Sequence, residues 1–415
     1  MKTIIKNIKE LVNVDYKDRT WSVGKDMSTI NTIEDAFIEI NNGIISSFGS
    51  MNSWEGIDDW NNTKIIDADG GMVFPSYCDS HTHLVFAESR EKEFVDRLKG
   101  LTYQEIAQKG GGILNSANTL QKTSEEELIK KALVQAKKVI KTGTGAIEIK
   151  SGYGLTLESE LKILRVIKKL SEITPLTIKS TFLGAHAIPK KYERKRKDYI
   201  KLITEEMIPQ VSEENLADFI DVFCEEGYFS IDETDKILTA AKKYRLTPKT
   251  HVNQFTILGG VELSVSHNAL SVDHLEQMCK KDFEALQGSK TMPTMLPGCS
   301  FFLGIPYGPA KQIIEKNLPL ALASDFNPGS SPNSNMNFIA SLGCLKMNLL
   351  PEEVINATTI NTAYAMGVEN ILGSIKKGKK ANLFITNRIE SYAYLPYSFG
   401  ENLINKIILN GIIQE

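Results

Sequence analysis

Cysteine and histidine are scarce in this chain. Its 415 residues contain five cysteines, an odd number at wide spacings with no CxxC, and only six histidines. Such a set excludes a disulfide framework and a thiolate zinc site, and it is typical of proteins from a reducing compartment. We therefore expect a cytoplasmic protein.

Long apolar runs and an excess of one charge are also missing. No stretch approaches the ~18 apolar residues of a transmembrane helix, and charges interrupt the N-terminal segment, unlike a signal peptide. Lysine and arginine number 48 against 51 aspartates and glutamates, which gives no reason to expect nucleic acid. The basic run Lys190–Lys197 contains Glu193 and adjoins Asp198, so we interpret it as a solvated segment. The 42% hydrophobic and 24% charged fractions are those of a globular protein. We expect neither a membrane nor a nucleic acid as partner.

Both ends of the chain have β-strand patterns. The turn signal Asn41-Asn42-Gly43 predicts a hairpin, because such turns need positive φ. Neither end can bury a sheet face alone, so we predict one small β-sandwich domain built from residues 1–72 and 368–415. Its expected strands are Ala36–Ile40, Ile44–Phe48, Lys64–Asp67, Ala381–Thr386 and Lys406–Leu409.

Between these ends, strand-like and helix-like segments alternate. Eight β-rich segments over ~250 residues favour an α/β fold closed into a (β/α)8 TIM-like barrel, which we assign to residues 73–367. The predicted strands are Val73–Cys78, Ala146–Ile149, Thr177–Leu183, Phe219–Cys224, Pro248–Val252, Ala269–Val272, Thr291–Leu296 and Leu318–Ala323. Helical periodicity marks Glu125–Ile140, Leu157–Leu170, Ile231–Tyr244 and Gly308–Lys316 among others.

Five of the six histidines follow or end predicted strands, where barrel enzymes place their catalytic groups. They are His81, His83, His186, His251 and His274. The spacing of His81 and His83 points both imidazoles to one side of an extended chain. Together with His251 and Asp325, they form a three-nitrogen, one-oxygen ligand set for a divalent ion with a position left for water. A lone HxH would often be incidental, but only a barrel brings all four residues together.

The remaining polar groups suggest how a reaction could run. His274 is predicted to act as a general acid or base, or to donate to a developing oxyanion, although a purely structural role is the alternative. Asp325 can also accept a proton from the attacking water and hand it to a leaving nitrogen. The fourth predicted strand ends in Cys224-Glu225-Glu226, without the lysine that bridges two metals in some barrels. We therefore expect one metal ion.

Several motifs resemble those of a known family. PSYCDSHTH and ASDFNPG are similar to the amidohydrolase superfamily, and FAESREKEF, GGGI, EIKSGYGL, FLGAHAIP, SVDHLE, SDFNPGSSP and GSIKKGKKANLFI resemble the imidazolonepropionase family within it. The first motif alone would indicate only the superfamily, whereas the joint set covers nearly the whole chain and is specific.

The resemblance implies an activity and a site. The activity is hydrolysis of the ring amide of 4-imidazolone-5-propanoate to N-formimidoyl-L-glutamate, in histidine degradation. The site would hold one Zn²⁺ or iron ion (Fe²⁺ or Fe³⁺) per subunit of a homodimer, on His81, His83, His251 and Asp325. The substrate, a small molecule with a carboxylate, would contact Arg90, Tyr153, His186, Asn327, Gly329 and Ser330.

Arg90 and Tyr153 each have a second interpretation. The guanidinium of Arg90 matches the geometry of a carboxylate, but an ion pair with Glu88, Glu91 or Glu93 is the alternative. Tyr153 could serve as a packing aromatic.

One catalytic position departs from the family pattern, which reads HxxE after the metal-binding histidine. This chain has His251-Val252-Asn253-Gln254. Glutamine cannot ionise but can donate and accept hydrogen bonds. We therefore expect Gln254 to orient the substrate ring, and we assign proton transfer to Asp325 and His274.

Two other functions remain open at this point. An aminohydrolase of a heterocyclic ring would use the same ligands, but it typically needs the glutamate that Gln254 replaces. A non-catalytic barrel kept for assembly would tend to lose metal ligands, and all four are present.

Overall fold

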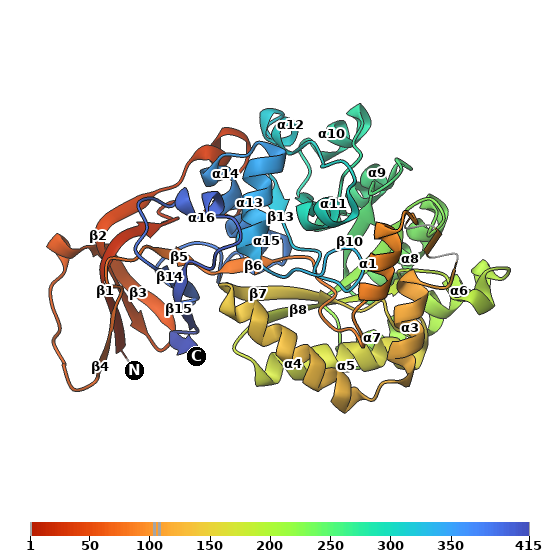
Figure 1. Cartoon of the computed structure of the whole chain (residues 1–415), viewed down its shortest axis with the longest axis horizontal. Helices are drawn as coiled ribbons and strands as arrows, with labels where there is room; N and C mark the ends of the chain where they lie inside the picture. The colour runs from red at the N-terminus through yellow and green to blue at the C-terminus, as the bar shows by residue number, and fades with distance from the viewer. Residues whose placement is uncertain (1, 103–104, 107–108, 415) are drawn as a thin grey trace.

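The computed structural model describes residues 2–102, 105–106 and 109–414. Two sheets organise them, and each has eight strands. In Figure 1 the sheet formed by the chain ends lies to the left, and the helix-covered barrel lies to the right. Among the described residues, no helix is both long and apolar enough to cross a membrane.

The barrel consists of parallel strands in chain order. They are β6 (Tyr77–Asp79), β7 (Thr144–Lys150), β8 (Thr177–Ala185), β9 (Phe219–Cys224), β10 (Thr247–Val252), β11 (Ser271–His274), β12 (Met292–Met295) and β13 (Ala321–Leu322). A parallel bridge between Thr82 and Phe326 connects the first strand to the last, and the backbone N–H of Ser324 donates to Asp79 Oδ1 at 3.0 Å. These contacts nearly close the sheet, which confirms the predicted barrel.

Helices follow most barrel strands and bury their apolar faces against the sheet. Ser124 and Ser230 cap two of them by accepting from backbone N–H groups three residues later. The helices are α1 (Glu91–Leu98), α3 (Gly112–Lys122), α4 (Glu125–Lys141), α5 (Leu157–Ile173), α6 (Arg196–Leu202), α7 (Ile208–Glu213), α8 (Ile231–Lys242), α9 (Gly260–Ser266), α10 (Lys280–Leu286), α11 (Pro297–Leu303), α12 (Ala310–Glu315), α13 (Met336–Met347), α14 (Pro351–Thr358), α15 (Ile360–Ala365) and α16 (Tyr394–Tyr397).

The second sheet draws strands from both chain ends, as predicted. Its longest strand, Lys2–Val12, contains a bulge at which Asn7 has φ +56°. Along one edge, this strand pairs with Thr63–Asp67 before the bulge and with Val73 after it. The strands are β1 (Lys2–Val12), β2 (Thr32–Asn41), β3 (Ile44–Ser50), β4 (Thr63–Asp67), β5 (Val73–Pro75), β14 (Leu383–Thr386), β15 (Ile404–Leu409) and β16 (Ile412–Gln414).

The first predicted barrel strand, Val73–Cys78, is wrong as a single strand. Its first half is β5, which pairs with β1 and β14 in the terminal sheet, and its second half is β6 in the barrel. Between them the N–H of Ser76 donates to the carbonyl of Asn382 at 2.8 Å. The uninterrupted apolar pattern hid this crossing, because both halves are buried.

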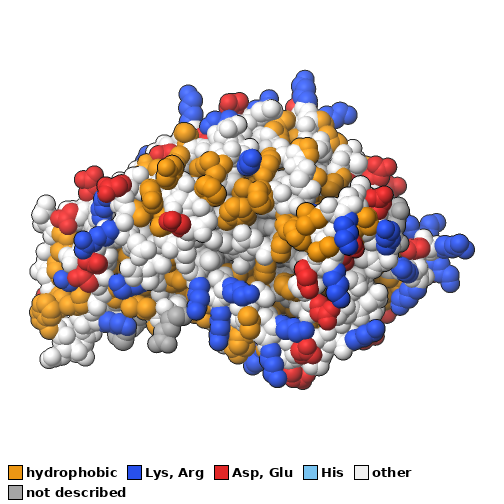
Figure 2. All heavy atoms as spheres, viewed as in Figure 1, with side chains coloured by type: hydrophobic (Ala, Val, Ile, Leu, Met, Phe, Trp, Pro, Cys, Tyr) orange, Lys and Arg blue, Asp and Glu red, His pale blue; other side chains and the backbone are white. Residues whose placement is uncertain are grey.

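Charged side chains of both signs are interspersed over the face of the molecule seen in Figure 2. Blue side chains are densest at the right-hand end, where Figure 1 places α6. There Arg196 forms an ion pair with Glu233, with 2.6 Å between Nη2 and Oε2. The last two residues of the basic run thus begin α6, and Arg196 pairs there with an acidic side chain of α8.

An aromatic cluster fixes the terminal sheet against the barrel. Phe384 of β14 is fully buried, and its ring centroid lies 5.1 Å from those of both Phe74 and Tyr77. We predict that Phe384→Ala lowers the free energy of unfolding by about 3–5 kcal/mol, because it leaves a cavity. Urea denaturation measures this loss. Phe399→Ala, at a 64% exposed position, is the control, and equal losses in both variants would contradict the assignment.

Candidate active site

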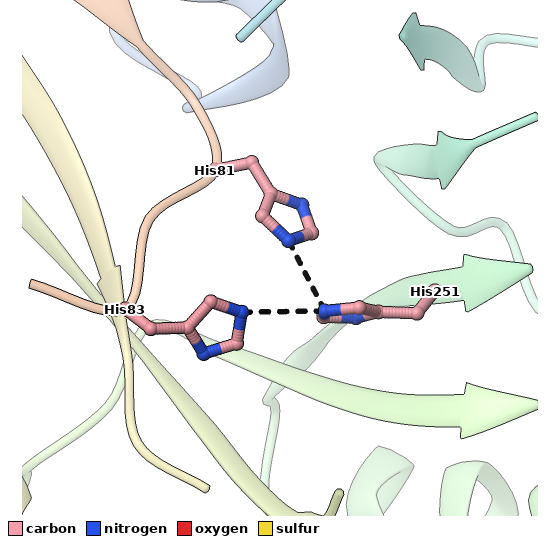
Figure 3. Close-up of side chains that lie close together, drawn as sticks. All are labelled: His81, His83 and His251. Atoms are coloured by element: carbon pink, nitrogen blue, oxygen red, sulfur yellow. Dashed lines mark hydrogen bonds between the residues drawn. The ribbon is translucent and has the colours of Figure 1, made fainter. Parts of the chain in front are cut away.

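Three histidines direct their Nε2 atoms at one another at the carboxyl ends of the barrel strands (Figure 3). The Nε2 of His251 lies 3.1 Å from that of His81 and 3.4 Å from that of His83. Two nitrogens bound tetrahedrally to zinc, each about 2.0–2.1 Å from it, would be about 3.3 Å apart. The three nitrogens are therefore spaced as the corners of a metal site.

Asp325 provides the fourth corner. Its Oδ1 lies 3.6 Å from His81 Nε2 and 3.8 Å from His83 Nε2. The residue has φ +52°, a conformation that aspartate tolerates better than most residues. The side-chain amide of Asn327 donates to the Asp325 carbonyl at 2.6 Å and so holds this turn. Three imidazoles and one carboxylate fit zinc or a similar divalent ion.

Two buried carboxylates fix the orientation of the ligand histidines. Asp273 Oδ2 lies 2.7 Å from Nδ1 of His81, and Asp221 Oδ2 lies 2.9 Å from Nδ1 of His251. Because each Nδ1–H donates to a carboxylate, each Nε2 keeps its lone pair for a metal. Burial lowers the pKa of His81 well below its ordinary value, which also favours the neutral, ligating form.

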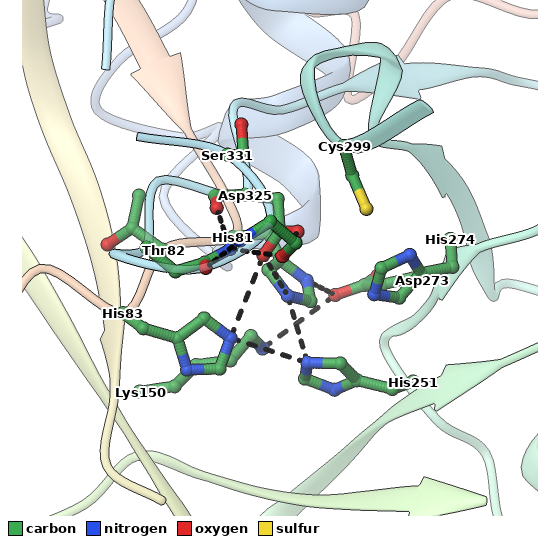
Figure 4. Close-up of polar contacts among 12 residues, drawn as sticks. His81, Thr82, His83, Lys150, His251, Asp273, His274, Cys299, Asp325 and Ser331 are labelled. Carbon is green, nitrogen blue, oxygen red and sulfur yellow. Dashed lines mark hydrogen bonds and ion pairs between the residues drawn. The ribbon is translucent and has the colours of Figure 1, made fainter. Parts of the chain in front are cut away.

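Both carboxylates share one ammonium group, that of Lys150, whose pairing with Asp273 is drawn in Figure 4. Lys150 Nζ lies 2.8 Å from Asp221 Oδ2, 3.7 Å from Asp273 Oδ2 and 2.6 Å from Glu148 Oε1. Burial opposes protonation, yet these carboxylates raise the pKa of Lys150 above its usual range. A lysine held as ammonium cannot carry the carboxyl group that bridges two metal ions in some barrels.

Most of the residues predicted for the site line one cavity above this cluster. They are His83, Arg90, Tyr153, His186, His251, Gln254, His274, Asp325, Asn327 and Ser330, together with Ile113 and Phe223. The last two are apolar or aromatic positions that resembled ordinary core in the sequence. His81 lies beneath the cavity, with its side chain fully buried.

Arg90 reaches this cavity and also makes an ion pair. It is only 7% exposed, and its Nε and Nη2 lie 2.8 and 2.6 Å from Glu93 Oε2. The ion pair with Glu93, which was the alternative interpretation of Arg90, is therefore present, although the pair is buried. Gly329 packs against this guanidinium, since a Cβ there would lie 2.1 Å from Arg90 Nη1. The glycine therefore contributes space for Arg90.

His186 and Tyr153 form an aromatic wall beside the ligands. The His186 ring is stacked 5.0 Å from that of His83, and Tyr153 lies 5.5 Å from His186 between ring centroids. Burial and the nearby His251 lower the pKa of His186 to about 3. His186 is thus a neutral ring at physiological pH, with Nδ1 placed 3.0 Å from the carbonyl oxygen of Gly152.

Gln254 lies at the edge of the cavity, where its Nε2 donates to Cys299 Sγ at 3.3 Å. Glu225 anchors its loop, because one carboxylate oxygen accepts from the backbone N–H groups of Gln254 and Phe255 at 3.0 Å. From the sequence, the only signal for Glu225 is its position at the end of a predicted strand.

Metal content tests the ligand set. We expect the protein, equilibrated with Zn²⁺ and desalted, to keep one equivalent by elemental analysis, and His251→Asn to lose it, because the remaining ligands leave the site open. His267→Asn is the control, since His267 bonds Asp235 outside the cavity. Full metal retention by His251→Asn would refute the assignment.

The chain matches the model of the amidohydrolase family over residues 72–413. It is 54% identical over 413 residues to an imidazolonepropionase of Flavobacterium johnsoniae, with 100% of both chains covered. It is 42% identical to one of Alkaliphilus oremlandii, covering 99% of this chain and 97% of that relative.

Solved structures with the same fold are more distant in sequence. E. coli guanine deaminase has a TM-score of 0.77 at 14% identity, covering 100% of this chain and 99% of the deaminase. A triazine hydrolase from Arthobacter aurescens has a TM-score of 0.75 at 12% identity, covering 99% and 94%. These two show the fold alone, whereas the family model and the full-length relatives show more: the chain belongs to the imidazolonepropionases of the metal-dependent amidohydrolase family.

Proposed function

We propose that this cavity hydrolyses the ring amide of 4-imidazolone-5-propanoate to N-formimidoyl-L-glutamate, a step of histidine degradation. The imidazolonepropionase relatives support this activity. The structural observation that carries the proposal is the presence of a buried guanidinium, Arg90, in the same cavity as the metal-ligand cluster. A substrate with a reactive ring and a carboxylate tail needs both groups at once.

One Zn²⁺ or iron ion would be held by His81, His83, His251 and Asp325. When bound, such an ion lowers the pKa of water and polarises a carbonyl. The same nitrogen and oxygen ligands suit either metal.

The functional groups of the side chains that line the cavity suggest how each would bind the substrate. Arg90 would pair with the propanoate through its planar fork. Tyr153 and the neutral His186 would hold the ring or its tail by hydrogen bonds. Gln254 would orient the ring nitrogens with its amide.

The loop after β13 would close the site around the substrate. Asn327 and Ser330 line the cavity, and Asn327 Nδ2 donates to Ser330 Oγ at 2.8 Å. Gly329 leaves room there for Arg90. Together these residues would contact substrate or product.

Asp325 and His274 would carry the reaction. As water attacks the ring carbonyl and the C–O bond forms, Asp325 accepts the water's proton. His274 donates a hydrogen bond to the developing oxyanion. Asp325 then delivers the proton to the ring nitrogen as the C–N bond breaks.

Two features make the aminohydrolase alternative weaker. Gln254 cannot deliver a proton to a ring nitrogen, and Arg90 favours an anionic substrate. Release of ammonia from aminated heterocycles, without turnover of the imidazolone, would reverse this choice.

We also propose a cytoplasmic homodimer that binds neither nucleic acid nor membrane. The scarce, unpaired cysteines and the mixture of surface charges support this view. The dimer is what the resemblance to the imidazolonepropionase family implies. Sedimentation of the purified protein would measure its oligomeric state.

The activity has a direct assay. We expect the imidazolone absorbance to fall when the purified protein is added, and we expect chelation to stop this and added metal to restore it. Asp325→Asn should reduce kcat by at least about 1000-fold, because it removes both a ligand and the proton acceptor, while circular dichroism stays unchanged. Near-normal turnover by this variant would exclude the proposed proton route.

Arg90→Met tests recognition of the carboxylate. Loss of charge-assisted hydrogen bonds of about 1.5–3 kcal/mol should raise KM roughly 10- to 100-fold, with a smaller change in kcat. Arg97→Met is the matched control, because Arg97 lies on α1, the helix that Arg90 directly precedes, but packs on Phe302 outside the cavity. If KM were the same in Arg90→Met as in the wild type, the carboxylate would bind elsewhere.

A further inference from the structure

A fully buried carboxylate beside the cavity has no role in the mechanism above. Glu160 lies in the first turn of α5, and its side chain has no exposed surface. Its Oε1 accepts from the backbone N–H groups of Gly154 at 2.7 Å and Leu155 at 2.8 Å. Its Oε2 accepts from the backbone N–H of Gly152 at 3.0 Å. One side chain thus binds three backbone N–H groups of the loop that follows β7.

This loop belongs to the wall of the cavity. Tyr153, which lines the cavity, stands between Gly152 and Gly154. The carbonyl oxygen of Gly152 accepts from His186 Nδ1 at 3.0 Å, while the N–H of the same glycine donates to Glu160. The carboxylate is therefore connected directly to the backbone that carries one predicted substrate contact and that binds another.

The sequence of the loop does not by itself select the observed backbone. Gly152 has φ +106°, which glycine adopts without strain, whereas Leu155 has φ +57°, which is unfavourable for leucine. Glycines on both sides of Tyr153 leave this segment many other conformations. Buried N–H groups also need acceptors, and Glu160 provides them in this one arrangement.

Capping of α5 is the rival explanation for Glu160. Thr156 already caps this helix, because its side chain accepts from the backbone N–H of Ser159 at 3.2 Å. The three N–H groups that Glu160 binds all precede Thr156 in the chain. The carboxylate therefore orders the loop, whereas Thr156 ends the helix.

We propose that Glu160 is a positioning residue for substrate binding, which fixes the loop after β7 so that Tyr153 contacts the substrate. This assignment rests on the proposed hydrolysis. Glu160 acts through Tyr153, since it is not among the described residues that line the cavity. Glu225 holds the loop of Gln254 in a similar way, by accepting from backbone N–H groups.

Glu160→Gln tests the proposal in the metal-loaded enzyme. The amide keeps the shape of the carboxylate, but its NH2 group cannot accept a hydrogen bond. We expect KM to rise about tenfold, as for loss of a hydrogen bond to a charged group, while kcat changes less than about threefold. Glu158→Gln is the matched control, because Glu158 is an exposed carboxylate in the same turn of α5. An unchanged KM in Glu160→Gln would overturn the proposal.

A double-mutant cycle separates positioning from general destabilisation. In the Tyr153→Phe background, Glu160→Gln should raise KM less than about threefold, because the hydroxyl that the loop places is already absent. Equal effects in both backgrounds would show that Glu160 does not act through Tyr153. Glu160→Asp keeps the buried charge but shortens its reach by one methylene, so it should retain the fold and raise KM by an intermediate factor.

A spectroscopic measurement does not depend on turnover. Fluorine NMR of protein labelled with fluorotyrosine reports on 13 tyrosines, and the resonance that Tyr153→Phe removes identifies Tyr153. We expect this resonance to shift or broaden in Glu160→Gln and to stay unchanged in Glu158→Gln. An unaltered Tyr153 resonance in Glu160→Gln would refute the positioning role.

Binding of an unreactive imidazole with a propanoate side chain separates this proposal from the proposed hydrolysis. By calorimetry, we expect the Kd of Glu160→Gln to be about tenfold higher than that of the wild type. Equal Kd values, with a wild type that hydrolyses the imidazolone, would refute the role of Glu160 alone. A tenfold difference with no turnover by the metal-loaded wild type would instead refute the hydrolysis and support the role of Glu160.

Discussion

The buried ammonium of Lys150 is the constraint on which the site depends. Asp221 and Asp273 each bind this ammonium and the Nδ1 of one ligand histidine. Buried charges are tolerated only when they are paired and hydrogen-bonded, so removing Lys150 would leave carboxylates uncompensated within the barrel. The lysine thereby holds two carboxylates, and through them two imidazoles, in the positions that a metal ion requires.

The low-dielectric interior also determines which side chains around the site are charged and which are neutral. Beneath the ligands, Lys150 and Lys249 face Glu148, Asp221 and Asp273, which leaves one excess negative charge to favour a cation above. Around the cavity, burial and the nearby His251 lower the pKa of His186 to about 3, although the Gly152 carbonyl and Asp221 act against them, so its ring is neutral. A ring amide with an acidic tail would thus meet a cation at the tail, a neutral ring at one side and a donor at its carbonyl.

Much of this arrangement was predictable from the sequence, because it depends on periodicity and strand ends. Alternating segments predicted the barrel, and polar residues after strands predicted the convergence of His81, His83, His251 and Asp325. Long-range or strained features were not predictable. At Ser76 the chain passes from the terminal sheet to the barrel. The sequence pattern does not show this change of sheet, because the residues on both sides of Ser76 are buried. The contact between Glu276 and His274 depends on backbone with positive φ at His274, which no residue preference indicates.

The most direct test is a crystal structure of the protein grown with zinc and an unreactive imidazole that carries an acidic side chain, with the metal located by anomalous scattering. We expect one ion about 2.0–2.3 Å from His81, His83, His251 and Asp325, with the ligand's carboxylate on Arg90 and its ring beside His274. An ion located elsewhere in the barrel, or a carboxylate bound away from Arg90, would contradict the central claim that this charge network builds a metal site for an anionic ring substrate.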